Sequence, residues 1–121
     1  MTPKDTLKIG SKIFNSRLMI GTGKYQSPQI MVDSLESSKS EIITVAIRRI
    51  KNMDKDSNLL QHINWSKYWM LPNTAGCKNS EEAIRIALLG RELAKLSGQE
   101  DNNFIKLEVI PDTRYLLPDP I

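Results

Sequence analysis

The stretch "EIITVAIRRI", residues 41–50, decides the fold class of this chain of 121 residues. Its apolar residues are almost continuous: Ile42, Ile43, Val45, Ala46 and Ile47. A strand that is covered on both faces has this pattern, whereas a strand with one face in water alternates apolar and polar residues. The stretch is therefore predicted to be a buried strand of a parallel sheet, with helical connections on either side.

The elements before this strand repeat the pattern. "RLMIGTGKY", residues 17–25, is a compact apolar run that ends in two glycines, which is typical of a buried strand followed by a tight turn. Ser27 as N-cap and Pro28 at the first helical position then predict a helix. Further upstream, "LKIGSKIFNS", residues 7–16, alternates apolar and polar residues around a glycine and predicts a small hairpin that precedes the main fold.

The elements after this strand continue the alternation. "YWMLPNTAG", residues 68–76, predicts a third strand that Pro72 ends, because proline cannot donate to a ladder. A helix is predicted from the Asn79 N-cap, with Glu82 in a capping-box position, to Gly98; Ile84, Ala87 and Leu88 recur at helical spacing within it. "NFIKLEVI", residues 103–110, predicts a fourth strand.

Strands and helices in alternation predict an α/β fold with a parallel sheet, either doubly wound or bent into a barrel. A (β/α)₈ barrel has eight strands and about 250 residues, so four strands are about half of one. Residues 1–121 are predicted to form one partial domain without a second domain.

Composition narrows the classes of partner. The net charge is +3, but the basic residues are scattered and only Arg48-Arg49-Ile50-Lys51 forms a local group, so no nucleic acid is expected. No apolar run reaches the length of a membrane span, and "MTPKDTLKIG" lacks the pattern of a signal or transit peptide. One cysteine, Cys77, and one histidine, His62, predict no metal site; Cys77 is expected to be a small buried residue and His62 a surface residue.

Two charges lie two residues apart in the predicted fourth strand, Lys106 and Glu108. Side chains at this spacing point to the same side, here opposite to Ile105, Leu107 and Val109. In a barrel the pair is predicted to face the interior near the carboxyl end of the strand, where barrel active sites lie. A lysine taken out of water forms an imine with a ketone, and a nearby carboxylate transfers protons. A structural ion pair, or an exposed edge strand, is the alternative interpretation.

Other candidate residues lie at the predicted carboxyl ends of strands. Gly21-Thr22-Gly23-Lys24 lacks both the G-x-G-x-x-G pattern and the Walker ending, which argues against a nucleotide, although its amides are suited to a pocket wall. One of Arg48 and Arg49 is predicted to face inward, with a solvated rim as the alternative for either. Asn73, Thr74 and Arg48 are the candidate substrate-binding residues.

Six strings occur together and in a fixed order along the chain: "SRLMIGTGKY", "EIITVAIRR", "LPNTAGC", "EEAIRIALLGREL", "IKLEVI" and "LLPDP". Together they resemble the thiazole synthase family of thiamine biosynthesis, over nearly the whole chain. The family fold is a (β/α)₈ barrel. The resemblance therefore implies that the chain corresponds to the N-terminal half, about the first four β/α units.

The resemblance also implies a reaction. The family joins 1-deoxy-D-xylulose 5-phosphate, a glycine-derived imine and sulfur from a thiocarboxylated sulfur-carrier protein. Lys106 stands where the family has the lysine that forms an imine with the sugar ketone, and Glu108 stands where the family has an acid/base glutamate. A homo-oligomer is implied, with a radical tyrosine lyase or a glycine oxidase supplying the glycine imine and with no cofactor of its own.

Two parts of the family pattern have no match in the chain, a second acid/base aspartate and the glycine-rich loops that bind the sugar phosphate. A piece of a longer protein is expected, or a naturally shortened gene. Two other functions stay open: an imine-forming enzyme of the aldolase type, which needs no sulfur carrier, and a non-catalytic fragment that only associates with other subunits. The resemblance also implies the location, because the family is bacterial and cytosolic or encoded in some plastid genomes. The composition rich in isoleucine, lysine and asparagine suits an A/T-rich plastid gene and an A/T-rich bacterium alike, so the expected location is the chloroplast stroma or the bacterial cytoplasm.

Overall fold

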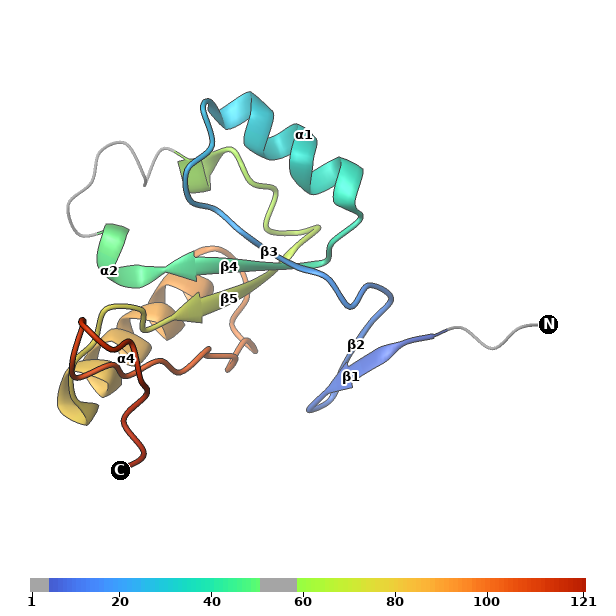
Figure 1. Ribbon diagram of the computed structural model, residues 1–121. Helices are drawn as coiled ribbons and strands as arrows, with labels where there is room; N and C mark the ends of the chain where they lie inside the picture. Colours follow the sequence, from blue (N-terminus) through green and yellow to red (C-terminus); the bar gives the residue numbers. More distant parts are fainter. Residues whose placement is uncertain (1–4, 51–58) are drawn as a thin grey trace.

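The computed structural model describes residues 5–50 and 59–121 (Figure 1). Lys51, the last residue of the local basic group, lies outside the described residues. An antiparallel hairpin comes first, formed by β1 (Leu7–Ile9) and β2 (Lys12–Phe14). A parallel sheet in the order β3-β4-β5 follows, formed by β3 (Met19–Gly21), β4 (Ile42–Ala46) and β5 (Trp69–Asn73). The predicted hairpin and the predicted α/β fold with a parallel sheet are both confirmed.

Helices connect the parallel strands. They are α1 (Pro28–Ser38) between β3 and β4, the short α2 (Ile47–Ile50) directly after β4, and α4 (Ser80–Leu96) after β5. Both predicted N-caps are present: the side chain of Ser27 accepts a hydrogen bond from the amide of Ile30, and that of Asn79 accepts one from the amide of Glu82. Each satisfies an amide that the first turn of a helix leaves without a partner.

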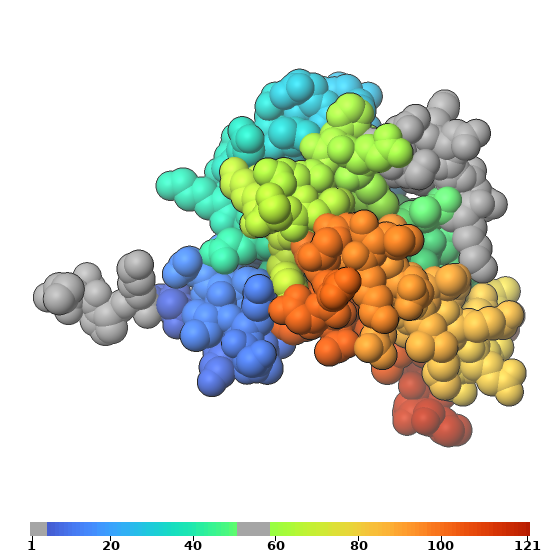
Figure 2. Space-filling model, turned by 180° about the vertical axis from the view of Figure 1, so that it is seen from behind, coloured from blue at the N-terminus to red at the C-terminus, as the bar shows by residue number. Residues whose placement is uncertain are grey.

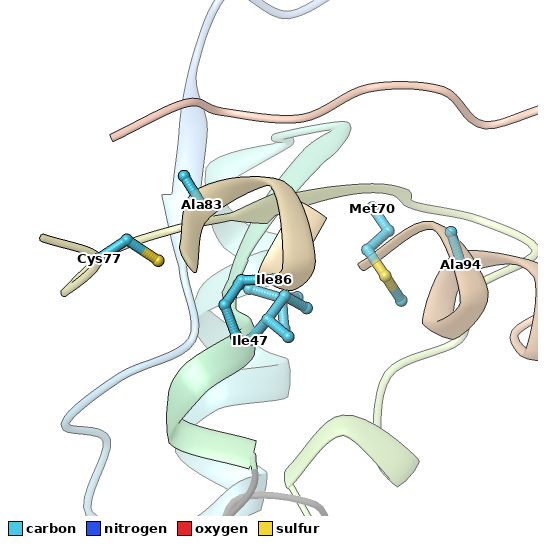
Figure 3. Close-up of a cluster of buried hydrophobic side chains, with 7 residues drawn as sticks. Ile47, Met70, Cys77, Ala83, Ile86 and Ala94 are labelled. Carbon is cyan, nitrogen blue, oxygen red and sulfur yellow. The ribbon is translucent and has the colours of Figure 1, made fainter. Parts of the chain in front are cut away.

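The two long helices cover the same face of the sheet. Ile43 of β4 packs with Met31 and Leu35 of α1. Val45, two residues further along β4, packs with residues of α4 in a second cluster (Figure 3). Residues two apart on a strand share a face, so α1 and α4 lie on one side. Successive parallel strands with right-handed connections have their helices on one face, both in a barrel and in each half of a doubly wound sheet.

Close approach of α4 to β5 depends on a glycine. A Cβ added at Gly90 would lie 2.7 Å from the Cβ of Pro72, closer than carbon atoms approach without a shift. Gly90 is buried in the middle of α4. Glycine in a helix interior normally costs about 0.5–1 kcal/mol relative to alanine, and here the packing of α4 on β5 compensates for that cost.

The opposite face of the sheet is closed at its amino end by the hairpin. Phe14 of β2 is buried with Ile42, Trp69 and Leu71. The ring of Phe104 meets those of Phe14 and Trp69 edge to face, with centroids 6.1 Å and 5.6 Å apart. Figure 2 shows the hairpin (blue) against the segment near residue 100 (orange). The hairpin therefore covers the apolar amino ends of the strands and leaves their carboxyl ends open.

The prediction that Pro72 ends the third strand is wrong. β5 continues through Pro72 to Asn73, in register with Val45 and Ala46 of β4. The carbonyl of Pro72 accepts a hydrogen bond of 2.8 Å from the amide of Lys106, so the ring nitrogen also faces the segment at 103–110. Proline is tolerated because its missing N–H lies on that side and not toward β4.

The predicted fourth strand is only partly formed. Residues 103–110 run beside β5, but they pair with it through one isolated parallel bridge, between Asn73 and Lys106. One physical reason is Pro72, which removes a donor from this side of β5. The amide of Ile110 bonds to the carbonyl of Cys77, beyond the end of β5.

Two further expectations are corrected. Ile84 and Leu88 of α4 are 61% and 55% exposed, and the buried face of the helix is Ala83, Ile86, Gly90 and Ala94. Ile84 and Leu88 thus face away from the sheet, and three of the four buried residues of α4 are small, which allows close packing. In addition, β4 ends at Ala46, so Arg48 and Arg49 lie on α2 and do not close the strand.

Candidate functional site

A pocket of about 400 Å³ opens at the carboxyl ends of the parallel strands. The pocket is lined by the loop after β3, the end of β4, α2, the end of β5 and the segment at 106–108. Its lining includes Gly23, Lys24, Arg49, Asn73, Lys106 and Glu108. Ligands of parallel α/β folds bind at this end of the strands.

Lys106 and Glu108 both line this pocket. Lys106 bridges to Asn73, and Leu107 between the two charged residues points away and is 73% exposed. The predicted alternation is therefore present even though the strand is incomplete. The side chain of Lys106 is exposed, and among the described residues no ion pair joins it to Glu108.

Thr74 positions the backbone of Glu108. Its hydroxyl donates to the carbonyl of Glu108 at 2.7 Å and accepts from the amide of Glu108 at 2.8 Å. Its amide donates to the carbonyl of Lys106 at 3.3 Å. Thr74 is completely buried and does not line the pocket, so the structure gives it a positioning contact with Glu108.

Thr74→Val is expected to lower the stability of the fold. Valine keeps the shape but leaves the amide and carbonyl of Glu108 without the hydroxyl, which costs about 1–3 kcal/mol of unfolding free energy. Urea unfolding measures this loss. Thr74→Ser retains the hydroxyl and is the control; equal losses in both variants would contradict this role.

Asn73 combines a pocket position with a role in the turn. It is buried, it lines the pocket, and its Oδ1 accepts a hydrogen bond of 3.1 Å from the amide of Ala75. It lies between Ala46 and Lys106 on neighbouring strands. A role for Asn73 in substrate binding stays a prediction; Asn73 lies beside Lys106 on the neighbouring segment, and both line the same pocket.

The two adjacent arginines have different surroundings. Arg48 donates from Nη1 to the carbonyl of Gly76, and its Nη2 lies 3.5 Å from Oε1 of Glu82. Arg49 lines the pocket, and Arg48 does not. The sequence predicted that one of the two faces inward and assigned Arg48 to substrate binding. The structure brings Arg49 and not Arg48 to the pocket, because Arg48 is held at Gly76 and Glu82.

Cys77 and His62 lie outside the pocket lining. Cys77 is fully buried in the cluster of Figure 3, and burial raises the pKa of its thiol, with the Glu82 carboxylate acting in the same direction. Both effects disfavour the thiolate, as expected for a small core residue. His62 is exposed. Over 5–50 and 59–121, no three His, Cys, Asp or Glu side chains gather where a metal ion would be held.

Leu59 and Leu60 form an apolar part of the pocket wall that sequence reasoning did not assign. The sequence shows these residues only as an apolar pair after a polar stretch, and such a pair does not indicate which strand ends it will cover.

Among the helices within residues 5–50 and 59–121, none has the length and hydrophobicity of a membrane span.

Comparison with known proteins identifies the family. The model of the thiazole biosynthesis protein ThiG family matches residues 8–121. A thiazole synthase of Prochlorococcus marinus strain MIT 9301 is 73% identical over 116 residues, which are 96% of this chain and 44% of that protein. A thiazole synthase of Prochlorococcus marinus subsp. pastoris is 67% identical over 121 residues, which are 100% of this chain and 46% of that protein.

The chain thus spans less than half the length of these relatives. The family match nevertheless covers every element of the described sheet and every residue that lines the pocket. On this evidence, the chain belongs to the thiazole biosynthesis protein ThiG family.

Proposed function

We propose that this chain is the imine-forming part of a thiazole synthase of thiamine biosynthesis. In this proposal the full protein is a closed (β/α)₈ barrel, and the described strands belong to about its first four β/α units, the N-terminal half. The observation that carries the proposal is Lys106 and Glu108 together on a pocket at the carboxyl ends of parallel strands. The order of the strands, β3-β4-β5 and then the segment at 103–110, supports the barrel, because successive strands of a barrel are neighbours.

In the proposed reaction, the neutral amine of Lys106 adds to the ketone carbon of 1-deoxy-D-xylulose 5-phosphate, and water leaves as the imine forms. The protonated imine withdraws electrons, so a proton on the neighbouring carbon is removed more easily. Glu108, two residues away on the same side, takes up this proton and returns it during the rearrangement of the sugar. Closure of the barrel would take the exposed amine of Lys106 out of water.

The proposed co-reactants are a glycine-derived imine, from a radical tyrosine lyase or a glycine oxidase, and a thiocarboxylated sulfur-carrier protein. The carrier supplies the ring sulfur. An imine-forming enzyme of the aldolase type would use the same lysine but no carrier. Consumption of the thiocarboxylate therefore separates the two functions.

Reductive trapping tests the proposal. The longest chain that the gene encodes is incubated with 1-deoxy-D-xylulose 5-phosphate and borohydride, which reduces an imine to a stable secondary amine. Peptide mapping is expected to find the sugar adduct on Lys106 and not on Lys95, which is exposed on α4. An adduct spread over many lysines, or no adduct, would sink the proposal.

A further inference from the structure

The starting observation is that one arginine of an adjacent pair is held by the protein. Arg48 is bonded to the carbonyl of Gly76 and paired with Glu82. Gly76 has φ +90°, and a Cβ there would overlap the Arg48 guanidinium. The guanidinium of Arg48 therefore binds the loop between β5 and α4.

Arg49 extends in a different direction, toward the loop after β3. A Cβ built at Gly23 would lie 3.0 Å from Nη1 of Arg49, so the guanidinium rests against the backbone of this loop. Glycine at position 23 has no side chain and therefore leaves space for this guanidinium. Lys24, next in the loop, lines the same pocket, so two positive charges lie at this end of it.

Lys106 lies at the other end of the same pocket. Ala46, Asn73 and Lys106 are neighbours on successive strands, and β3 lies beyond β4. Adjacent strands are about 4.8 Å apart, so the segment of Lys106 and β3 are separated by roughly 14 Å. An amine and a guanidinium thus face one pocket from opposite ends, with Asn73 between them.

We propose that Arg49 binds an oxyanion of a reactant in this pocket while Lys106 holds a carbonyl carbon. A guanidinium donates two parallel hydrogen bonds to a carboxylate or a phosphate, which an ammonium group does not. The oxyanion is the carboxylate of the second reactant, because the family resemblance assigns the sugar phosphate to loops that have no match in this chain; binding of the phosphate by Arg49 is the other outcome of the test. The inference rests on the proposed function only for the identity of these reactants.

Chemical modification tests the binding without any catalysis. Phenylglyoxal modifies accessible arginines, and peptide mapping of the longest encoded chain measures the rate at each one. Inorganic phosphate or acetate is expected to slow modification of Arg49 by about 10-fold at saturation. Arg91, exposed on α4 away from the pocket, is the internal control and is expected to react at an unchanged rate. Failure of both anions to protect Arg49 selectively would overturn the inference.

Substitution distinguishes the two sources of the oxyanion. If Arg49 binds the sugar phosphate, Arg49→Gln raises the concentration for half-maximal trapping of 1-deoxy-D-xylulose 5-phosphate by about 10-fold or more, and leaves that of unphosphorylated 1-deoxy-D-xylulose unchanged. If it binds the carboxylate, sugar trapping is unchanged and the KM of the second reactant rises by a similar factor. Arg91→Gln is the control, and equal behaviour of the two variants would refute the role of Arg49.

The two proposals fail in different ways. If no sugar is trapped on Lys106 in the unchanged protein, the proposed function is wrong, yet protection of Arg49 by anions still tests the oxyanion site. If trapping occurs on Lys106 but Arg49→Gln affects neither reactant and neither anion protects, the function stands and the oxyanion site is wrong.

Discussion

Lys106→Arg is expected to abolish trapping of 1-deoxy-D-xylulose 5-phosphate and to lower the rate of thiazole formation by about 10⁴-fold or more, the scale on which loss of a covalent catalyst acts. Arginine keeps the positive charge and most of the length of lysine. Its guanidinium, however, stays protonated at any working pH and offers no free amine. Trapping by mass spectrometry and a single-turnover assay measure the two losses.

The fold is expected to tolerate this change, because the Lys106 side chain is exposed at the pocket and its contacts with β5 are made by its backbone. The unfolding midpoint of Lys106→Arg should therefore match that of the unchanged protein. Retained trapping in Lys106→Arg would show that another amine carries the reaction.

Glu108→Gln is the matched variant. It removes the proposed proton-transferring group and leaves the amine of Lys106, so trapping is expected to persist while turnover falls by about 10²–10⁴-fold. A structural ion pair between the two residues predicts a different outcome, in which both variants lose stability and neither separates trapping from turnover. The pair of variants thus decides between the catalytic and the structural interpretation of the same two charges.

The parts of the fold that local chemistry determines could be predicted from the sequence. The β-branched run at Ile42–Ala46 and the N-caps Ser27 and Asn79 each depend on a few neighbouring residues, and each is present. The path of β5 through Pro72 could not be predicted, because it depends on which neighbour the missing N–H faces. The buried side of α4 was also missed, because three of its four buried residues, among them Gly90, are small, whereas the large residues Ile84 and Leu88 are exposed.

Local sequence also predicts one part of the candidate site and not the other. Lys106 and Glu108 share the pocket because the alternation of side chains along an extended chain is local. The choice between Arg48 and Arg49 was not predictable, because α2 replaces the end of the strand and its turn redirects both side chains. The contact of Thr74 with Glu108 joins residues 34 positions apart, a separation at which sequence spacing carries no signal.

The two edges of the described sheet have no further neighbouring strand. Within the described residues, β3 pairs with β4 alone and the segment at 103–110 pairs with β5 alone. Leu107 is 73% exposed on this outer segment, and Ile84 and Leu88 are exposed on α4. Unpaired edges with exposed apolar side chains are templates for association with another chain.

We therefore expect the 121-residue polypeptide, prepared alone, to self-associate, and Leu107→Lys to reduce that association. Leu96→Lys is the control, because Leu96 is 85% exposed at the end of α4, away from the sheet edge. In the longest chain that the gene encodes, Leu107→Lys should instead destabilise the fold. Leu107 points away from the pocket, toward the side on which helices cover the strands of a barrel, so a lysine beneath such a helix buries a charge and lowers the unfolding free energy by several kcal/mol. Light scattering and urea unfolding measure the two effects. A monodisperse, cooperatively unfolding polypeptide that Leu107→Lys leaves unchanged in both settings would instead indicate that the half-barrel is complete by itself.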